Sequence, residues 1–340
     1  MIEEFRVGFI GCGSYSASLA KASRRAGLRP VICYDINAER ARVFAQTFEI
    51  TAAPDIDSLL SEDIEGVVIA TPNNAHRANA EAAAAAGKHI FVDKPIANTL
   101  EDGLAIIDAA RRAGLVLAVG HNGRRMAGHR KMKEMIDAGA VGTPITVEAN
   151  FSHSGGLGLT PAHWRYHRDQ CPGLPLMQLG VHFADTVQYL LGDVLEVFSF
   201  MSHVATPADS EDVTVSLLRF DGGLLGYLGS NYASPPVYYV NVYGTGGNLL
   251  CDGGSALRYR AAGSRNVEDV ALVGAETQVE ELEEFARCAR SGAAPEVDGR
   301  AGLMALAVVR AALASHERKR PVALDDIIAE ARSRLGQRVG

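Results

Sequence analysis

The chain has 340 residues, of which 47% are hydrophobic and 21% are charged, and its formal net charge is −7. This composition is globular with room for two domains, and it excludes fibrous and disordered classes. The negative charge disfavours a nucleic-acid partner, because such binding usually needs a basic face.

The N-terminal segment "MIEEFRVGFIG" carries acids before a short apolar run, which predicts a first strand rather than a signal peptide. No segment reaches the roughly 18 apolar residues of a membrane helix, so we expect a cytoplasmic protein with no membrane partner. The five cysteines are scattered and form no C-x-x-C pair, and we expect most of them to be small core residues.

Between residues 5 and 120, strand-like apolar runs alternate with helical patterns. The runs are "FRVGFI", "RPVICYD", "GVVIAT", "KHIFVD" and "LVLAVG". This alternation predicts an α/β domain with a Rossmann-type, doubly wound parallel sheet. Local signals mark helix ends, with Thr99 as an N-cap and Gly87 and Gly114 as terminating glycines.

After residue 120 the pattern changes to one helix near 125–138, followed by strand-like stretches joined by glycine turns. They predict a large, open, mostly antiparallel sheet. A helix that ends at Gly192 interrupts them, and three helices are expected near 277–291, 300–316 and 324–335. We therefore expect a dinucleotide-binding domain at 1–120 and an α+β domain for substrate binding and oligomerisation at 121–340.

The first strand leads into "GFIGCGSYS", where Gly11 and Gly13 fit the first two positions of the dinucleotide motif and Ser16 takes the third. Ser14 and Tyr15 open the following helix, whose amides favour a pyrophosphate. Asp35 closes the second strand at about the spacing expected for the acid that binds ribose hydroxyls. An acid there repels a 2′-phosphate, so the sequence favours NAD over NADP.

Polar residues follow the next two strands at the edge where ligands bind in an open parallel sheet. "IATPNNAH" and "VDKPIANT" place five of them there, and we expect these to ring one crevice: Thr71, Asn73, His76, Asp93 and Lys94.

These motifs, together with "VGHNGR", "HWR" and "GVHFAD", resemble the Gfo/Idh/MocA family of sugar and polyol oxidoreductases over nearly the whole chain. The resemblance implies two catalytic residues. Lys94 orients substrate and cofactor and shares the acid–base work with His182, which takes the place of the family's helical catalytic histidine. Asp93 occupies the position at which the family has a glutamate. Gln178 stands four residues before His182, where many relatives have an aspartate, and glutamine can bind a hydroxyl but cannot take a proton.

The resemblance also implies cofactor contacts from Asn122, Trp164 and Arg165, and substrate contacts from Asn122, His163 and Gln178. Asp185 either orients His182 or is a packing carboxylate. Arg125 and the basic residues after it are expected on a solvated helix face. The spacing of His153, His163 and His167 could suggest a metal, but proline and glycines interrupt the segment, so we predict no metal site.

The sequence thus predicts an NAD-dependent dehydrogenase of a sugar or polyol that forms a homodimer or homotetramer. One alternative is an NAD-dependent glycosidase or lyase that oxidises its sugar transiently. The other is a non-catalytic protein that senses sugar or NAD, which the glutamine at position 178 keeps open.

Overall fold

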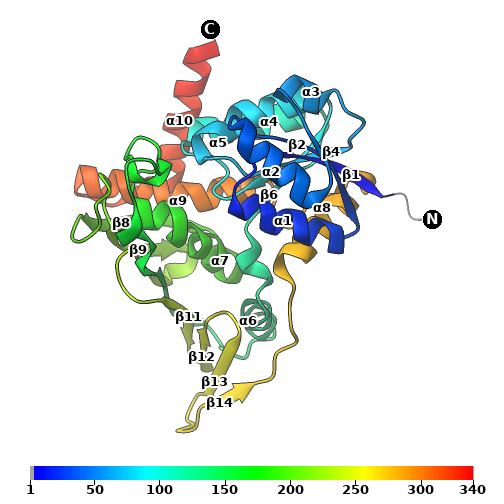
Figure 1. Ribbon diagram of the computed structural model, residues 1–340. Helices are drawn as coiled ribbons and strands as arrows, with labels where there is room; N and C mark the ends of the chain where they lie inside the picture. The colour runs from blue at the N-terminus through cyan, green and yellow to red at the C-terminus, as the bar shows by residue number, and fades with distance from the viewer. Residues whose placement is uncertain (1–3, 340) are drawn as a thin grey trace. The chain divides into compact units, whose positions relative to one another are not determined.

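The structure is a computed structural model that describes residues 4–339 (Figure 1). Contacts divide the chain into two units. The first extends through Asn122 and also contains Glu276–Leu303, and the second contains Gly123–Ala275 and the residues from Met304 onward. From the sequence we expected residues 276–303 to belong to the second domain, whereas the contacts group them with the first unit.

The first unit holds a parallel sheet with the strand order β3–β2–β1–β4–β5–β6. This confirms the predicted doubly wound α/β fold. Its strands are β1 (Phe5–Ile10), β2 (Leu28–Tyr34), β3 (Thr51–Ala52), β4 (Gly66–Ile69), β5 (His89–Asp93) and β6 (Leu117–Gly120). Its helices are α1 (Ser14–Arg25), α2 (Ala38–Phe48), α3 (Ile56–Leu60), α4 (His76–Ala85), α5 (Leu100–Arg112) and α8 (Thr277–Ser291).

The central strands of this sheet are buried along their length, as in the continuous runs Val67–Ile69 and Ile90–Val92. Such runs are typical of strands that helices cover on both faces. The α1 helix packs on α8, and α4 packs on α5. The loops that follow the strands carry the polar residues of the sequence motifs, and several of these, such as Asp35, Asn73 and His76, are buried.

The second unit holds a mixed sheet with the order β14–β13–β12–β11–β7–β10–β9–β8–β15, in which β7 and β10 pair in parallel and the other pairs are antiparallel. This confirms the predicted large, mostly antiparallel sheet. Its strands are β7 (Pro144–Ser152), β8 (Val194–Ser202), β9 (Val213–Phe220), β10 (Leu225–Asn231), β11 (Val237–Gly244), β12 (Gly247–Asp252), β13 (Ala256–Ala261), β14 (Glu268–Val270) and β15 (Val322–Ala323). The helices are α6 (Ala127–Asp137), α7 (Val181–Leu191) and α10 (Leu324–Val339), while α9 (Gly299–Arg318) has residues in both units.

One face of the second sheet is covered and the other is exposed. Along β9, Thr214, Ser216 and Leu218 are buried, whereas Val215 and Leu217 are exposed. Cross-strand register places more apolar side chains on the exposed side. We call this set the open face: Phe198, Phe200, Val215, Leu217, Leu225 and Tyr227.

Candidate active site

The glycine loop after β1 has the geometry of a dinucleotide site. Gly11 has φ +92°, and its N–H donates to the Tyr34 carbonyl at 2.8 Å. Gly13 is the N-cap of α1 and makes no side-chain cap hydrogen bond. A Cβ added at Gly13 would meet no atom within 4 Å. The loop therefore has room for a pyrophosphate, and the first amides of α1 are suited to bind it.

Asp35 anchors this loop from the end of β2. Its Oδ2 accepts the Cys12 N–H at 2.9 Å, and its Oδ1 accepts the Asn37 N–H at 2.8 Å. Arg40 lies 3.4 Å away as an ion-pair partner with a half-exposed side chain. Asp35 is 9% exposed, so its carboxylate is fixed beside the glycine loop. This is the placement expected of the acid that binds the ribose hydroxyls.

Helix α8 contributes to the same end of the first unit. Burial raises the pKa of Tyr15, and the negative charges of Asp93 and Glu281 raise it further, while a hydrogen bond to Gln278 opposes them. The Asn122 amide donates to the Thr277 hydroxyl at 3.1 Å. Two predicted cofactor residues, Tyr15 and Asn122, therefore contact a helix far away in the sequence.

His76 joins the loops that follow β4 and β5. Its side chain is fully buried, with Nε2 3.0 Å from the Thr71 carbonyl and Nδ1 3.1 Å from the Pro95 carbonyl. Burial lowers the pKa of His76, with a smaller contribution from Lys94, so the ring is held neutral. In this arrangement His76 positions the two loops, and a direct contact with cofactor stays a prediction.

The other predicted crevice residues lie on these loops. Asn73 is buried, and its amide lies 3.4 Å from the Asn98 amide oxygen. The Thr71 hydroxyl accepts from Asn79 at 3.3 Å. The Asp93 carboxylate accepts the backbone N–H of Lys94 at 2.8 Å, which fixes the start of the loop that carries the lysine. The structure thus brings Thr71, His76 and Lys94 together within the first unit.

In the second unit, Asp185 binds Arg124 through two hydrogen bonds of 2.7 and 2.6 Å. Their side chains are 1% and 11% exposed, so the pair is buried. This pairing agrees with a packing role for Asp185, and the orientation of His182 by Asp185 stays a prediction. The expectation of a solvated face from Arg125 onward was wrong in part, because Arg125 and His129 are buried.

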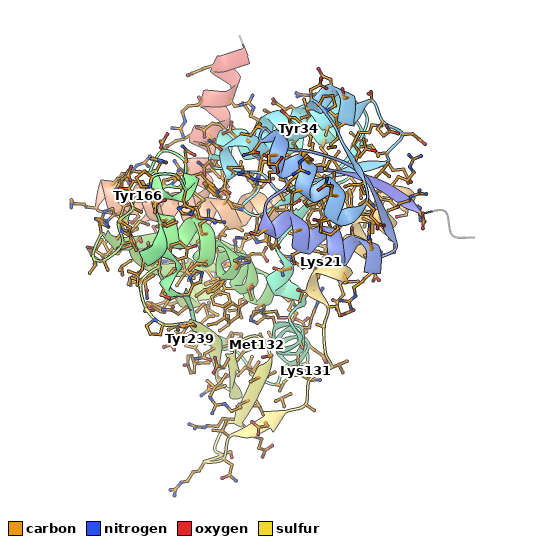
Figure 2. The ribbon with its side chains drawn as sticks, in the orientation of Figure 1. Lys21, Tyr34, Lys131, Met132, Tyr166 and Tyr239 are labelled. Atoms are coloured by element: carbon orange, nitrogen blue, oxygen red, sulfur yellow. The ribbon has the colours of Figure 1, made fainter. Side chains whose placement is uncertain are left out.

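The solvated part of this segment begins later, on α6. Lys131 pairs with Glu134, whereas its neighbour Met132 is fully buried. Lys131 and Met132 are labelled on α6 in Figure 2.

Gln178 lies on a π-helical turn (Leu176–Gly180) that runs directly into α7. Such turns are rare and frequently occur at functional sites. The Gln178 side chain is buried, and its oxygen accepts from Arg165 Nε at 2.9 Å. Its amide donates to Cys171 Sγ at 3.3 Å. Arg165 also stacks on Trp164, with Cζ 4.9 Å from the ring centroid. Three predicted site residues, Trp164, Arg165 and Gln178, therefore form one cluster.

His182 follows on α7 and is partly buried. Its ring centroid is 5.8 Å from that of Phe151, and Phe151 also contacts His153 at 6.0 Å. His153 in turn lies 4.7 Å from the Tyr232 ring. Phe151 and Tyr232 were not identified from the sequence, because apolar and aromatic residues in a strand pattern are usually core.

The remaining histidines of this region bond locally. His163 is exposed, and its Nδ1 accepts the Thr160 N–H at 3.1 Å. His167 Nε2 lies 2.9 Å from the Pro161 carbonyl. Over the part of the chain that the structure describes, no three His, Cys, Asp or Glu side chains gather as a metal site would require.

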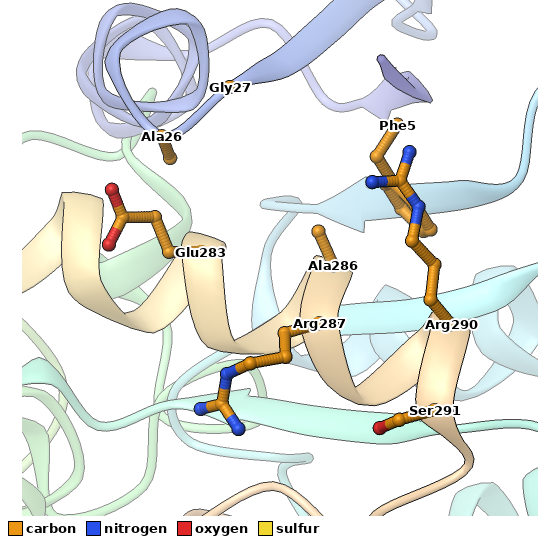
Figure 3. Close-up of a pocket in the computed structure, with 8 residues that line it drawn as sticks. All are labelled: Phe5, Ala26, Gly27, Glu283, Ala286, Arg287, Arg290 and Ser291. Atoms are coloured by element: carbon orange, nitrogen blue, oxygen red, sulfur yellow. The ribbon is translucent and has the colours of Figure 1, made fainter. Parts of the chain in front are cut away.

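A separate hollow of about 550 Å³ lies in the first unit (Figure 3). It is formed by the start of β1, the turn after α1 and one side of α8. Phe5 and Arg290 line it together, with Arg290 Cζ 5.6 Å from the Phe5 ring. Phe5 is the first residue of β1, at the opposite end of that strand from Gly11. The hollow contains none of the predicted site residues.

Comparisons with known proteins agree with this geometry. A family model described as an oxidoreductase family with an NAD-binding Rossmann fold matches residues 5–121, and the GFO/IDH/MocA C-terminal domain matches residues 129–250. The D-apiose dehydrogenase of Paraburkholderia graminis is 30% identical over 97% of this chain and 92% of that protein. The 1,5-anhydro-D-fructose reductase of Ensifer adhaerens is 32% identical over 72% of this chain and 75% of that protein.

Among solved structures, an oxidoreductase from Desulfitobacterium hafniense DCB-2, described as NADPH-dependent, has a TM-score of 0.91 and 35% identity. The match covers 96% of this chain and 100% of that one. The glycine loop, the anchored Asp35 and both matched domains thus lead to one conclusion: the chain belongs to the Gfo/Idh/MocA oxidoreductase family and carries an NAD-binding Rossmann domain.

Proposed function

We propose that the protein is an NAD-dependent dehydrogenase that acts on a hydroxyl-bearing carbon of a sugar, a polyol or a derivative of one. The observation that carries the proposal is the glycine loop with Asp35. The loop is open at Gly13, and both oxygens of Asp35 are already fixed beside it by backbone N–H groups.

The second unit offers groups suited to a polyhydroxylated ligand. Gln178, Arg165 and His153 combine hydrogen-bond donors and acceptors around a partly buried histidine, His182. A ligand that lacked a matching hydroxyl would leave such groups unpaired, and this is how polar sites select sugars.

In this proposal His182 takes the proton of the reacting hydroxyl and Lys94 polarises its oxygen, the roles that the family resemblance implies. Gln178 holds a substrate hydroxyl and does not move a proton. NAD, when bound, supplies the acceptor for the hydrogen that leaves the carbon. Asp35 favours NAD because its carboxylate repels a 2′-phosphate, although Arg40 beside it reduces that repulsion.

The test is NADH formation from NAD with a panel of inositols, aldoses, uronates and anhydrosugars. We expect one sugar class to give NADH, and we expect Lys94→Ala and His182→Ala to lower kcat about 100-fold or more. Lys21→Ala, an exposed lysine on α1 (Figure 2), is the control and keeps full activity.

If glycosides are cleaved while no NADH accumulates, the protein is a transient-oxidation glycosidase or lyase. If sugars bind without any turnover, it is a sensor, and the dehydrogenase proposal fails.

A further inference from the structure

Two buried cysteines lie next to the groups that fix the glycine loop. Cys12 stands between Gly11 and Gly13, and Cys33 lies on β2, two residues before Asp35. Residues two apart on a strand point to the same side of the sheet. Cys33 therefore shares its side with Asp35, which accepts the Cys12 N–H at 2.9 Å. Both cysteines carry free thiols, and they are 6% and 0% exposed.

The side chains of Cys12 and Cys33 contact each other. Both belong to the core cluster that residues of β1, α1 and α2 form, and a side-chain hydrogen bond joins them. This bond lowers the pKa of the Cys33 thiol, although burial and the negative charge of Asp35 oppose it. The same bond raises the pKa of Cys12, and burial raises it further. Cys12 is therefore the donor, and Cys33 is the sulfur on which a thiolate forms more readily.

Cys251 shows how a buried thiol behaves when burial is the largest influence on it. Burial raises the pKa of Cys251 to about 12, so this thiol stays protonated at neutral pH. At Cys33 the neighbouring thiol reverses the direction of the pKa change. Because the thiolate is the form of cysteine that oxidants attack, Cys33 with its partner Cys12 is better suited to oxidation than Cys251.

Of the two cysteines, Cys33 is fixed and Cys12 is the movable partner. The Cys33 carbonyl accepts the Ala53 N–H at 2.8 Å, and its Sγ lies 3.5 Å from the Ala41 carbonyl oxygen. Cys12 lies in the loop between β1 and α1. A disulfide brings two sulfurs to about 2.05 Å, much closer than two hydrogen-bonded thiols, so the bond would draw Cys12 toward β2. The Cys12 N–H would then leave its position on Asp35.

We propose that Cys12 and Cys33 form a redox-sensitive pair that controls cofactor binding, and that a small hydroperoxide such as hydrogen peroxide oxidises them to a disulfide. Each thiol gives up one proton and one electron, the O–O bond of the peroxide breaks, the S–S bond forms, and two water molecules leave. The disulfide shifts the loop suited to the pyrophosphate and the acid suited to the ribose, so the oxidised protein binds NAD more weakly. Bound NAD opposes disulfide formation by the same factor, because the two equilibria are linked.

The first test identifies the disulfide. The reduced protein is treated with hydrogen peroxide, with and without saturating NAD, then denatured and alkylated, and its peptides are analysed by mass spectrometry. We expect the peptides that contain Cys12 and Cys33 to be joined and to separate again after dithiothreitol treatment. NAD should lower the joined fraction, and Cys251 should remain open to alkylation.

The second test measures the affinity for NAD by calorimetry. We expect the peroxide-treated protein to bind NAD about 10-fold more weakly or worse than the reduced protein, and dithiothreitol to restore the affinity. Cys33→Ala removes one sulfur of the pair and should keep, after peroxide, the affinity that it has before. Cys12→Ala removes the other sulfur and should behave alike, so the test stands if one variant does not fold. Cys251→Ala is the matched buried control and should lose affinity as the wild type does.

Three results would overturn the proposal. In the first, Cys12 and Cys33 both remain open to alkylation after peroxide that fully oxidises a glutathione standard. In the second, the disulfide forms but the affinity for NAD stays as in the reduced protein. In the third, peroxide weakens NAD binding equally in wild type and in the folded Cys33→Ala or Cys12→Ala variant, so that oxidation elsewhere is the cause. The readouts are the thiol state and NAD binding, so they do not depend on whether a sugar is oxidised.

Discussion

Gly11 and Gly13 have different surroundings. Alanine substitutions at the two positions should therefore separate an effect on folding from an effect on cofactor binding. An alanine Cβ at Gly11 would lie 2.7 Å from the Ala70 carbonyl oxygen, and φ there is +92°. We predict that Gly11→Ala lowers the free energy of unfolding by about 2 kcal/mol or more. Gly13→Ala meets no such clash, so it should lower the free energy of unfolding by no more than about 1 kcal/mol, the cost of alanine at an N-cap. It should weaken NAD binding about 10-fold or more, because its Cβ occupies space that the pyrophosphate needs.

Urea unfolding and NAD titration of both variants check this pair. Unchanged NAD affinity in a folded Gly13→Ala variant would mean that the pyrophosphate does not approach this loop.

His129 predicts how stability changes with pH. It is fully buried, its Nδ1–H donates to the Gly123 carbonyl at 2.7 Å, and its Nε2 has no hydrogen-bond partner in the described structure. Burial lowers the pKa of His129 to about 4. In the unfolded chain the pKa of this histidine is about 6.5, so the unfolded state binds the proton more tightly than the folded state. The contribution of neutral His129 to the free energy of unfolding is therefore complete above about pH 6.5 and is lost as the pH falls toward 4.

As the pH falls from 7 to 5, the titration of His129 should therefore lower the free energy of unfolding by about 2 kcal/mol. His129→Asn should lose that part of the pH dependence, measured as the difference between wild type and variant in urea unfolding at the two pH values. Parallel profiles for the two proteins would show that His129 does not titrate on unfolding.

Among the secondary-structure elements, α5 provides a test of a predicted cap. Thr99 accepts the Asp102 N–H at 3.1 Å, and its hydroxyl donates to the Asp102 carboxylate at 2.7 Å. This confirms the N-cap that the sequence predicted. Thr99→Ala should lower the free energy of unfolding by about 1 kcal/mol, and Thr99→Ser should restore most of it. Equal stability of the alanine and serine variants would assign the effect to packing of the methyl group.

Local signals explain why much of the fold could be predicted. The strand runs of the first sheet, the cap at Thr99 and the positive-φ glycines Gly87 and Gly114 depend on residues close in sequence. Long-range contacts carry no such signal. The packing of α8 on α1 joins residues more than 250 positions apart, as in the Ser18–Gln278 hydrogen bond.

The candidate site shows the same limit. Motifs identified Gln178 and Arg165 separately. Their hydrogen bond depends on the π-helical turn, and no residue pattern in the sequence predicts such a turn. The Arg124–Asp185 pair was likewise not predicted, because nothing local links the two residues.

For the molecule as a whole, the open face supports the predicted self-association. Phe200 and Leu217 are 66% and 55% exposed, and they lie on neighbouring strands of the same face. Contiguous exposed apolar residues usually mark an interface. We propose that a second copy of the chain covers this face in a symmetric dimer, or in a tetramer built from such dimers.

The double variant Phe200→Glu/Leu217→Glu should lower the solution mass, measured by light scattering, to that of a monomer. Val273→Glu, which changes an 88% exposed residue outside the open face, should leave the mass as in wild type. A monomeric wild type, or an unchanged mass in the double variant, would contradict the self-association proposal.

In the part of the chain that the structure describes, no helix is long and apolar enough to cross a membrane.

The measurement that decides whether the chain is a dehydrogenase is transfer of deuterium from a sugar to the cofactor. A sugar from the active class, deuterated at its carbinol carbons, is incubated with NAD and the protein, and the recovered cofactor is analysed by mass spectrometry. We predict that singly deuterated NADH accumulates over many turnovers, and that His182→Ala abolishes it. Sugar consumed or bound while the cofactor stays oxidised and free of deuterium would contradict the proposed function.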